Sequence, residues 1–259
     1  IDSDAGNNRK TVRANGNRCR RAAERDSRQR RTAGGTMKLA HEDFENIFFL
    51  TPDTVNVLIV ESERAFYGYC SELYCQLNGE PGRFRLSHDD EEIPLPKNAV
   101  MFTDLLKFEA GDKKSTAKLY QQLQEAAENK YADDMVRLRF EIFGLLDKLD
   151  AESSCGISYD ENTDFISILK AFGVKITDDG NNLSEKLVTC LHALSGLLSF
   201  KCFFFVNLKT MLPPEDLALL YREAELCGWN LFLFENSERP KLSGEKTRII
   251  DRDLCEIVV

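Results

Sequence analysis

Residues 202–236 read CFFFVNLKTMLPPEDLALLYREAELCGWNLFLFEN, two short apolar runs on either side of a helical pattern. The runs CFFFV and LFLF are almost continuously apolar, which is typical of strands that are covered on both faces in a parallel sheet. Pro213 and Pro214 stand at the expected start of the helix, where a missing backbone N–H costs little. The stretch therefore predicts a buried strand, a turn, a helix and a second buried strand.

The first patterned part of the chain predicts a similar unit. Residues 54–62, TVNVLIVES, form a β-branched apolar run of strand length. In residues 63–79 the apolar side chains recur at helical spacing, and Gly79 supplies a stop. Residues 98–108 offer a further short strand, and residues 247–259 a last strand or hairpin. The two ends of the chain are therefore typical of an α/β protein.

The middle of the chain has a helical pattern instead. Between residues 115 and 149, apolar residues recur with the spacing of one helix face. Two more helical patterns follow, over residues 162–176 and 181–199. This part of the chain is expected to be built from helices.

These patterns predict a discontinuous α/β head, residues 37–110 and 185–259, with an extended helical insertion, residues 111–184. Residues 1–36 contain almost no large apolar side chain and cannot offset the entropy of ordering, so we expect a disordered basic extension. The extension is either a nucleic-acid-binding arm or an upstream segment that is not native to the protein, because patterned sequence begins only at Met37. We favour the second interpretation.

Charge is distributed unevenly along the chain. Residues 1–36 hold ten basic and four acidic residues, a net charge of +6, so the total of −9 leaves −15 for the remainder. A chain this acidic repels polyanions over long distances. Binding of DNA would therefore need basic side chains that are gathered locally.

The sequence argues against several classes of protein. The longest apolar neighbourhood, residues 191–206, is interrupted by polar residues and falls short of the roughly 20 apolar residues that a membrane span needs. The eight cysteines are scattered and never spaced as CxxC, so we expect small buried side chains rather than disulfides or a zinc site. Residues 1–36 lack the apolar centre of a signal peptide. We expect a cytoplasmic protein without a membrane partner.

The usual catalytic motifs are missing from the sequence. A phosphate-binding loop needs glycines directly after the first strand, but SERAFYGYC follows VLIVE here, and neither GxxxxGK[ST] nor GxGxxG occurs. The strand that begins at Cys202 leads into Asn207, which lacks the charge that orients magnesium. His41 and His88 lie in polar segments and are expected to be exposed, whereas His192 is expected in a helix core. We predict a non-enzyme.

Carboxylates are the abundant functional group of the middle segment. Seven acidic residues surround an expected helix–loop–helix junction: Glu141, Asp147, Asp150, Glu152, Asp160, Glu161 and Asp164. Clusters of hard oxygen ligands can hold Ca²⁺, although the spacing here is not that of an EF-hand loop. A solvated acidic surface is the alternative interpretation.

Several segments resemble a known family in the same order along the chain. FISILKAFGVKI (residues 165–176), residues 202–236 and RIIDRDLCEIV (residues 248–258) resemble the small CRISPR-associated spacer-acquisition protein of type II-A systems. TVNVLIVESERAFYGYCSEL (residues 54–73) is similar to the first strand and helix of that family. The resemblance lies in the order of segments over residues 37–259 rather than in one diagnostic motif.

The resemblance implies a fold and a function. Members of the family have a degenerate P-loop-ATPase-like head without a working nucleotide site, and an inserted, extended helical domain. They form ring-shaped homotetramers that Ca²⁺ stabilises, and they bind double-stranded DNA ends through the central hole without sequence preference. They act beside the CRISPR integrase complex and the RNA-guided nuclease during spacer acquisition, and they are not known as enzymes.

From this resemblance we expect binding residues in the helical insertion. The candidate DNA-binding residues are Lys113, Lys114, Lys118, Lys130, Arg137 and Arg139. The candidate calcium ligands are Glu141, Asp150, Asp160 and Glu161. An ordinary solvated helix face is the alternative for each basic residue. The alternative function is a protein–protein docking module with a degenerate nucleotide-binding head and no direct role on DNA.

Overall fold

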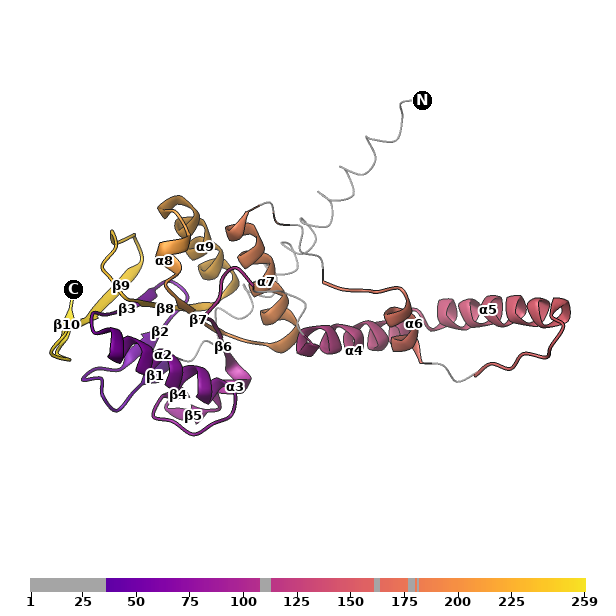
Figure 1. Cartoon of the computed structure of the whole chain (residues 1–259), viewed down its shortest axis with the longest axis horizontal. Coiled ribbons are helices and arrows are strands. Elements are labelled where there is room, and N and C mark those ends of the chain that lie inside the picture. The colour runs from indigo at the N-terminus through magenta and orange to yellow at the C-terminus, as the bar shows by residue number, and fades with distance from the viewer. Residues whose placement is uncertain (1–35, 108–112, 161–163, 177–179, 181) are drawn as a thin grey trace, which may run out of the picture. The chain divides into compact units, whose positions relative to one another are not determined.

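The structure is a computed structural model (Figure 1), and it describes residues 36–107, 113–160, 164–176, 180 and 182–259. The predicted basic extension, apart from Thr36, lies outside the described residues. The chain divides into two compact units. The first comprises Ile1–Phe108, Gly180–Val188 and Ser199–Val259, and the second comprises Glu109–Asp179 and Thr189–Leu198.

A six-stranded sheet forms the centre of the first unit. Its order is β10-β9-β3-β8-β7-β6, and every neighbouring pair is parallel except β9 and β10. The strands are β3 (Val55–Val60), β6 (Ala99–Phe102), β7 (Cys202–Val206), β8 (Asn230–Glu235), β9 (Glu245–Ile250) and β10 (Glu256–Val258). This mixed, mainly parallel sheet confirms the predicted α/β class, and β9 and β10 form a C-terminal hairpin.

Helices cover both faces of this sheet (Figure 1). α2 (Glu63–Leu77) begins after Ser62, whose hydroxyl accepts the backbone N–H of Ala65 at 3.4 Å. α9 (Pro214–Cys227) begins at the predicted prolines and lies on the opposite side of the sheet from α2. Because all six residues of both β3 and β8 are buried, these strands need cover on both faces, as their continuous apolar runs indicate. Two short helices, α3 (Leu95–Asn98) and α8 (Leu208–Met211), precede β6 and follow β7.

The sequence patterns do not predict the second sheet of this unit. It is antiparallel, in the order β2-β1-β4-β5, with β1 (Met37–Ala40), β2 (Phe48–Leu50), β4 (Arg85–His88) and β5 (Glu91–Ile93). Phe48 of β2 packs against Phe232 of β8 with ring centroids 4.8 Å apart. Phe84, just before β4, packs near Phe234 of the same strand. The small sheet therefore shares one buried cluster with α2 and one face of the large sheet.

His41 is buried in this unit, 5% exposed, so the expectation that it is exposed is wrong. Its Nδ1 atom accepts the backbone N–H of Asp43 at 3.1 Å, which leaves the proton on Nε2, 3.3 Å from Glu72 Oε2. Arg83 donates to both oxygens of Glu72, at 3.1 and 2.8 Å, and also contacts Asp43. The hydrogen bonds from Arg83 lower the pKa of the Glu72 carboxyl to about 2. A polar network that is buried only at His41 thus joins the small sheet to α2.

The second unit is helical. α4 (Lys113–Lys130) and α5 (Ala132–Glu152) divide the predicted helical stretch at Tyr131. α6 (Phe165–Ala171) follows, and α7 (Leu183–Leu198) begins in the first unit and continues into the second. The Tyr120 hydroxyl donates to the Val174 carbonyl at 2.8 Å, which joins α4 to the segment after α6. Among the described helices, none has the length and apolarity that crossing a bilayer requires.

The cysteines follow the expectation only in part. All seven that the structure describes are free, without a disulfide. Cys190 and Cys202 are buried, as expected for small apolar side chains, but Cys155 and Cys255 are exposed.

Arg83→Met should destabilise the first unit, because Glu72 and Asp43 then lose their shared cation. We expect a loss of about 1–2 kcal/mol of unfolding free energy at pH 7, a modest figure because the Arg83 side chain is 42% exposed. The low pKa of Glu72 contributes stability that is present above about pH 4.5 and lost as the pH falls toward 2. The variant should therefore lose less stability than wild type between pH 5 and pH 3 in urea unfolding.

Arg85→Met is the matched control, since the Arg85 guanidinium donates to the backbone carbonyls of Gly82 and Phe84, and the carboxylate that it approaches, Glu92 at 3.6 Å, is 68% exposed. It should leave the acid dependence of stability unchanged. Equal destabilisation of both variants, with the same pH dependence, would contradict the role given to Arg83.

Candidate functional site

Two of the candidate DNA-binding lysines share one face of α4. Lys114 and Lys118 are exposed and lie four residues apart, so their side chains are neighbours on the helix surface. Lys130 is exposed in the last turn of α4, roughly 24 Å along the axis from Lys114. Lys113 begins the helix, and its side chain lies outside what the structure describes. Among the lysines whose side chains the structure describes, a single chain therefore brings together one pair, Lys114 and Lys118.

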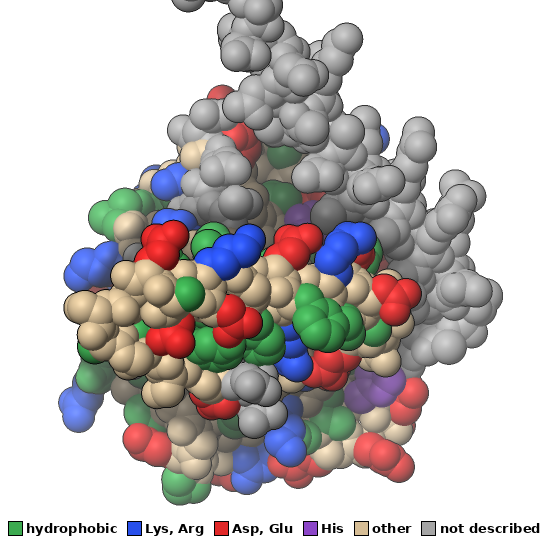
Figure 2. Space-filling model, turned by 90° about the vertical axis from the view of Figure 1, so that its right-hand side faces the viewer, with side chains coloured by type: hydrophobic (Ala, Val, Ile, Leu, Met, Phe, Trp, Pro, Cys, Tyr) green, Lys and Arg blue, Asp and Glu red, His purple; other side chains and the backbone are tan. Residues whose placement is uncertain are grey.

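The two candidate arginines lie on different faces of α5. Arg137 and Arg139 are exposed and two positions apart, and residues at this spacing do not face each other. Arg137 forms an ion pair with Asp134, one turn earlier on the helix. On the surface shown in Figure 2, Lys and Arg side chains lie among Asp and Glu side chains, with hydrophobic side chains exposed between them. Positive charge on this surface is local rather than continuous.

The candidate calcium ligands are spread along α5 and beyond it. Glu141 and Asp150 are both exposed, nine residues apart, which places them about 13 Å apart along the axis and on opposite sides of the helix. Asp160 is exposed after the helix, and Glu161 lies outside the described residues. In the described part of the chain, no three carboxylates of this segment gather at ligand distance. One chain therefore does not bring Glu141 and Asp150 to the same ion.

The segment after α5 folds back onto the helix. Asp150 Oδ1 accepts the backbone N–H of Ile157 at 2.7 Å, and Asp147 Oδ1 accepts the Tyr159 hydroxyl at 2.6 Å. The Tyr159 ring stacks on Phe143 with centroids 5.4 Å apart. Asp150 thus holds the returning chain as well as being a candidate metal ligand.

An apolar stripe runs along one face of α5. Its members, Leu138, Ile142, Leu145 and Leu149, follow alternating steps of four and three residues, the spacing of a coiled-coil seam. Their exposed fractions are 37%, 38%, 57% and 49%, and no residue of α5 is buried. Full burial of one leucine contributes about 1.5–3 kcal/mol, so an uncovered stripe of this size indicates an interaction surface.

Polar side chains stand at the carboxyl ends of two central strands in the first unit. Asn207 follows β7 in the left-handed conformation, with φ 54°, and its Oδ1 accepts the backbone N–H of Asn236 at 3.2 Å. Glu235 ends β8, is 1% exposed, and accepts the backbone N–H of Lys209 at 2.9 Å. The sequence interpretation considered Asn207 at a strand end and did not include Glu235. A sequence signal for this residue exists, because Glu235 directly follows the apolar run LFLF.

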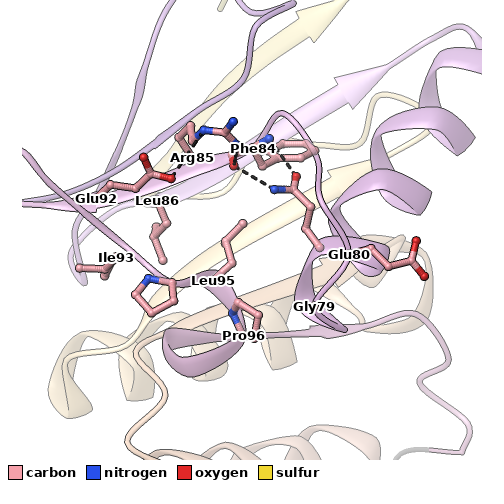
Figure 3. A pocket seen from close by; sticks show the side chains of 11 residues that line it. Gly79, Glu80, Phe84, Arg85, Leu86, Glu92, Ile93, Leu95 and Pro96 are labelled. Carbon is pink, nitrogen blue, oxygen red and sulfur yellow. Dashed lines mark hydrogen bonds and ion pairs between the residues drawn. The ribbon is translucent and has the colours of Figure 1, made fainter.

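A cleft lies between α2, α3 and the β4–β5 hairpin (Figure 3). Its volume is about 220 Å³, and Leu86, Ile93 and Leu95 supply much of its apolar lining. Arg85 and Glu92 approach to 3.6 Å on one side, so their charges offset each other. The lining residues that the structure describes include no histidine, cysteine or hydroxyl side chain. The cleft offers apolar contact without a nucleophile.

Comparison with known proteins connects this architecture to one family. The family model for "CRISPR-associated protein (Cas_Csn2)" matches residues 76–254. Among solved structures, the crystal structure of Stu0660 of Streptococcus thermophilus is similar, with a TM-score of 0.51 and 10% sequence identity. The similarity covers 83% of this chain and 74% of that chain, and at this identity it concerns the fold alone. No curated protein matches the chain significantly.

Proposed function

The chain belongs to the CRISPR-associated protein (Cas_Csn2) family, and on this premise we propose that it binds double-stranded DNA ends during CRISPR spacer acquisition. It acts as a ring-shaped homotetramer stabilised by calcium and catalyses no reaction itself. Its partners are the CRISPR integrase complex and the RNA-guided nuclease. The observation that carries the proposal is α5, a helix of 21 residues without a buried side chain; the exposed lysines of the preceding helix α4 support it.

The apolar stripe of α5 supports assembly from identical chains. A helix whose apolar face is uncovered in one chain gains free energy when that face packs against another helix. The α5 helix of a second copy presents a stripe of the same spacing. Closure of such contacts around an axis would produce a ring.

Local cations, rather than net charge, support binding to DNA. Residues 37–259 carry a net charge of −15, which opposes long-range attraction to a polyanion. Lys114 and Lys118 are exposed neighbours on α4 and can reach the phosphate backbone together. Contacts to phosphates carry no information on base identity, which suits binding without sequence preference.

The head supports a scaffold role without catalysis. Glu61 and Ser62 follow β3, so no glycine lets the backbone approach a phosphate there, and the Ser62 hydroxyl already caps α2. Asn207 follows β7, and its side-chain oxygen is engaged by Asn236. We interpret the head as a degenerate P-loop-ATPase-like domain that keeps a parallel sheet without the groups that would hold a nucleotide and magnesium.

Calcium sites shared between copies would explain the spread of the acidic candidates. Glu141 and Asp150 lie on opposite sides of α5, so each needs further ligands from elsewhere. Ca²⁺ takes about six to eight oxygen ligands, and carboxylates from a second copy can complete the set. Asp160 and Glu161 are the other candidates. Such sites would link calcium binding to assembly.

A protein–protein docking module without a direct role on DNA is the second candidate function. The apolar stripe of α5 and the net charge of −15 outside the basic extension favour it, because both suit a protein partner. In that case the partner, rather than a second copy, covers the stripe. Salt-sensitive binding of duplex DNA separates the two functions.

The double variant Lys114→Glu, Lys118→Glu should weaken binding to all duplexes alike. Each lost phosphate contact should reduce the slope of log affinity against log salt by about 0.9, so the slope should fall by about 1.8. Gel shifts with several unrelated duplexes between 50 and 200 mM salt measure both effects. Lys97→Glu with Lys107→Glu changes the net charge equally in the first unit and should retain the slope. Loss that depends on sequence, or no loss, would reject this placement.

The double variant Leu145→Glu, Leu149→Glu should reduce the oligomer to smaller species, because it buries two charges wherever the stripe packs. Light scattering at a fixed protein concentration measures the mass. Val136→Glu with Phe140→Glu is the matched control, since these exposed apolar residues lie on another face of α5. An unchanged mass in the stripe variant would exclude the stripe as the interface.

The double variant Glu141→Ala, Asp150→Ala should loosen the tetramer in the presence of calcium and have little effect after chelation. Because Asp150 also holds Ile157, Asp147→Ala serves as the control: it releases Tyr159 from the same returning segment without removing a candidate ligand. Sedimentation with and without calcium measures the difference. The assignment fails if calcium has the same effect on assembly in the double variant and in wild type.

A further inference from the structure

Glu235 is a buried carboxyl group that the proposed function does not use. It ends β8 and is 1% exposed. Its Oε1 atom accepts the backbone N–H of Lys209 in α8 at 2.9 Å, whereas its Oε2 atom has no hydrogen-bond partner among the described residues. Buried polar atoms are nearly always satisfied, so this one needs a physical explanation.

Glu235 takes the place of the missing cap of α8. Asn207 stands at the N-cap position of this helix but makes no capping hydrogen bond with its side chain. Its Oδ1 accepts the N–H of Asn236 instead. The free N–H of Lys209, in the first turn, is satisfied by Glu235. One carboxyl side chain therefore holds α8 to the end of β8.

The charged and titratable groups around Glu235 come from several elements. Lys209 of α8 lies 2.8 Å from Glu245 of β9, and these side chains are only 5% and 0% exposed. Tyr221 of α9 donates to the other oxygen of Glu245 at 2.8 Å. Arg239, in the loop after β8, donates to the Thr210 hydroxyl of α8 at 3.4 Å. The Lys209 ammonium is therefore engaged by Glu245 rather than by Glu235.

This surrounding makes ionisation of Glu235 unfavourable. Burial raises the pKa of the Glu235 carboxyl to about 7; Glu245 adds to the rise, while Lys209 and Arg239 oppose it. An ionised Glu235 would be a second buried anion beside a lysine that already serves Glu245. That arrangement is less favourable than a neutral carboxyl group with one unpaired oxygen.

We propose that the protonation state of Glu235 controls whether α8 and residues 236–244 stay held at the end of β8. The protonated side chain keeps them closed, and ionisation favours opening. We call Glu235, α8 and residues 236–244 the latch. The protonated carboxyl fits the buried position. The ionised carboxylate draws water or the Lys209 ammonium toward itself. Because that ammonium also holds the Pro240 carbonyl at 2.9 Å, its displacement releases the loop together with α8.

The latch lies at the carboxyl ends of β7 and β8, the edge at which ligands bind in open α/β sheets. Opening it would expose the end of β8 at Glu235, which is 1% exposed in the closed arrangement. The inference concerns regulation of the first unit and does not depend on DNA binding by the second.

Hydrogen–deuterium exchange of the full chain tests the latch. With a carboxyl pKa of about 7 in the closed state and the ordinary 4.5 in the open state, the opening equilibrium should rise about tenfold between pH 6 and pH 8 and then level off. After correction for intrinsic exchange, peptides that cover α8 and residues 236–244 should show this increase. They should also exchange faster than β3 peptides at both pH values, because the opening is local.

Glu235→Gln keeps an acceptor for Lys209 but cannot ionise, so it should abolish the tenfold increase. Glu238→Gln changes an exposed glutamate of the same loop and should retain it. The proposal is overturned if the increase is missing in wild type, if it persists in Glu235→Gln, or if the latch peptides exchange no faster than β3.

Carbon-13 NMR of the wild-type carboxyl groups decides the matter if Glu235→Gln does not fold. A Glu235 midpoint near pH 7, accompanied by shifts of the Lys209 and Thr210 amides, supports the latch. A midpoint below pH 5 overturns it.

Discussion

Burial of the central strands on both faces is the constraint on which the first unit depends. Every side chain of β3 and β8 is buried, so both faces of the sheet must be covered by other elements. α2 and the small antiparallel sheet cover one face, and α9 covers the other. Polar groups are then confined mainly to the strand ends, where Asn207 and Glu235 stand. Glu235 is the extreme case, because it stands at the end of a strand and is nevertheless buried, with its carboxyl group bonded to α8.

The local sequence pattern predicted those strands and helices whose formation depends on neighbouring residues. The strands β3, β7 and β8 and the helices α2 and α9 follow from continuous apolar runs, helical spacing and the prolines before α9. The small sheet does not, because its strands have three or four residues and β1 pairs with β4 from far along the chain. The prediction that His41 is exposed was wrong for the same reason. Its polar neighbours in sequence indicate a surface, but its partner Glu72 comes from a helix 31 residues away.

The candidate sites were likewise predictable from the sequence only in part. Sequence identifies lysines and carboxylates but does not show which of them meet in space. Helix geometry keeps Lys114 beside Lys118 and separates Glu141 from Asp150. The ion pair with Asp134 offsets part of the positive charge of Arg137. The apolar stripe of α5 was visible as a pattern, yet its exposure could be known only from the structure, because the same pattern also suits a helix packed within one chain. Whether these residues bind DNA and calcium remains a prediction.

We propose that identical chains close around the end of a DNA duplex. The most direct test of this proposal is binding of the purified protein to linear and covalently closed circular duplexes of one sequence, with and without calcium, followed by gel shift and light scattering. We expect a calcium-dependent oligomer that retains linear DNA and not circles. Equal retention of circles, or no binding to either form, would contradict it.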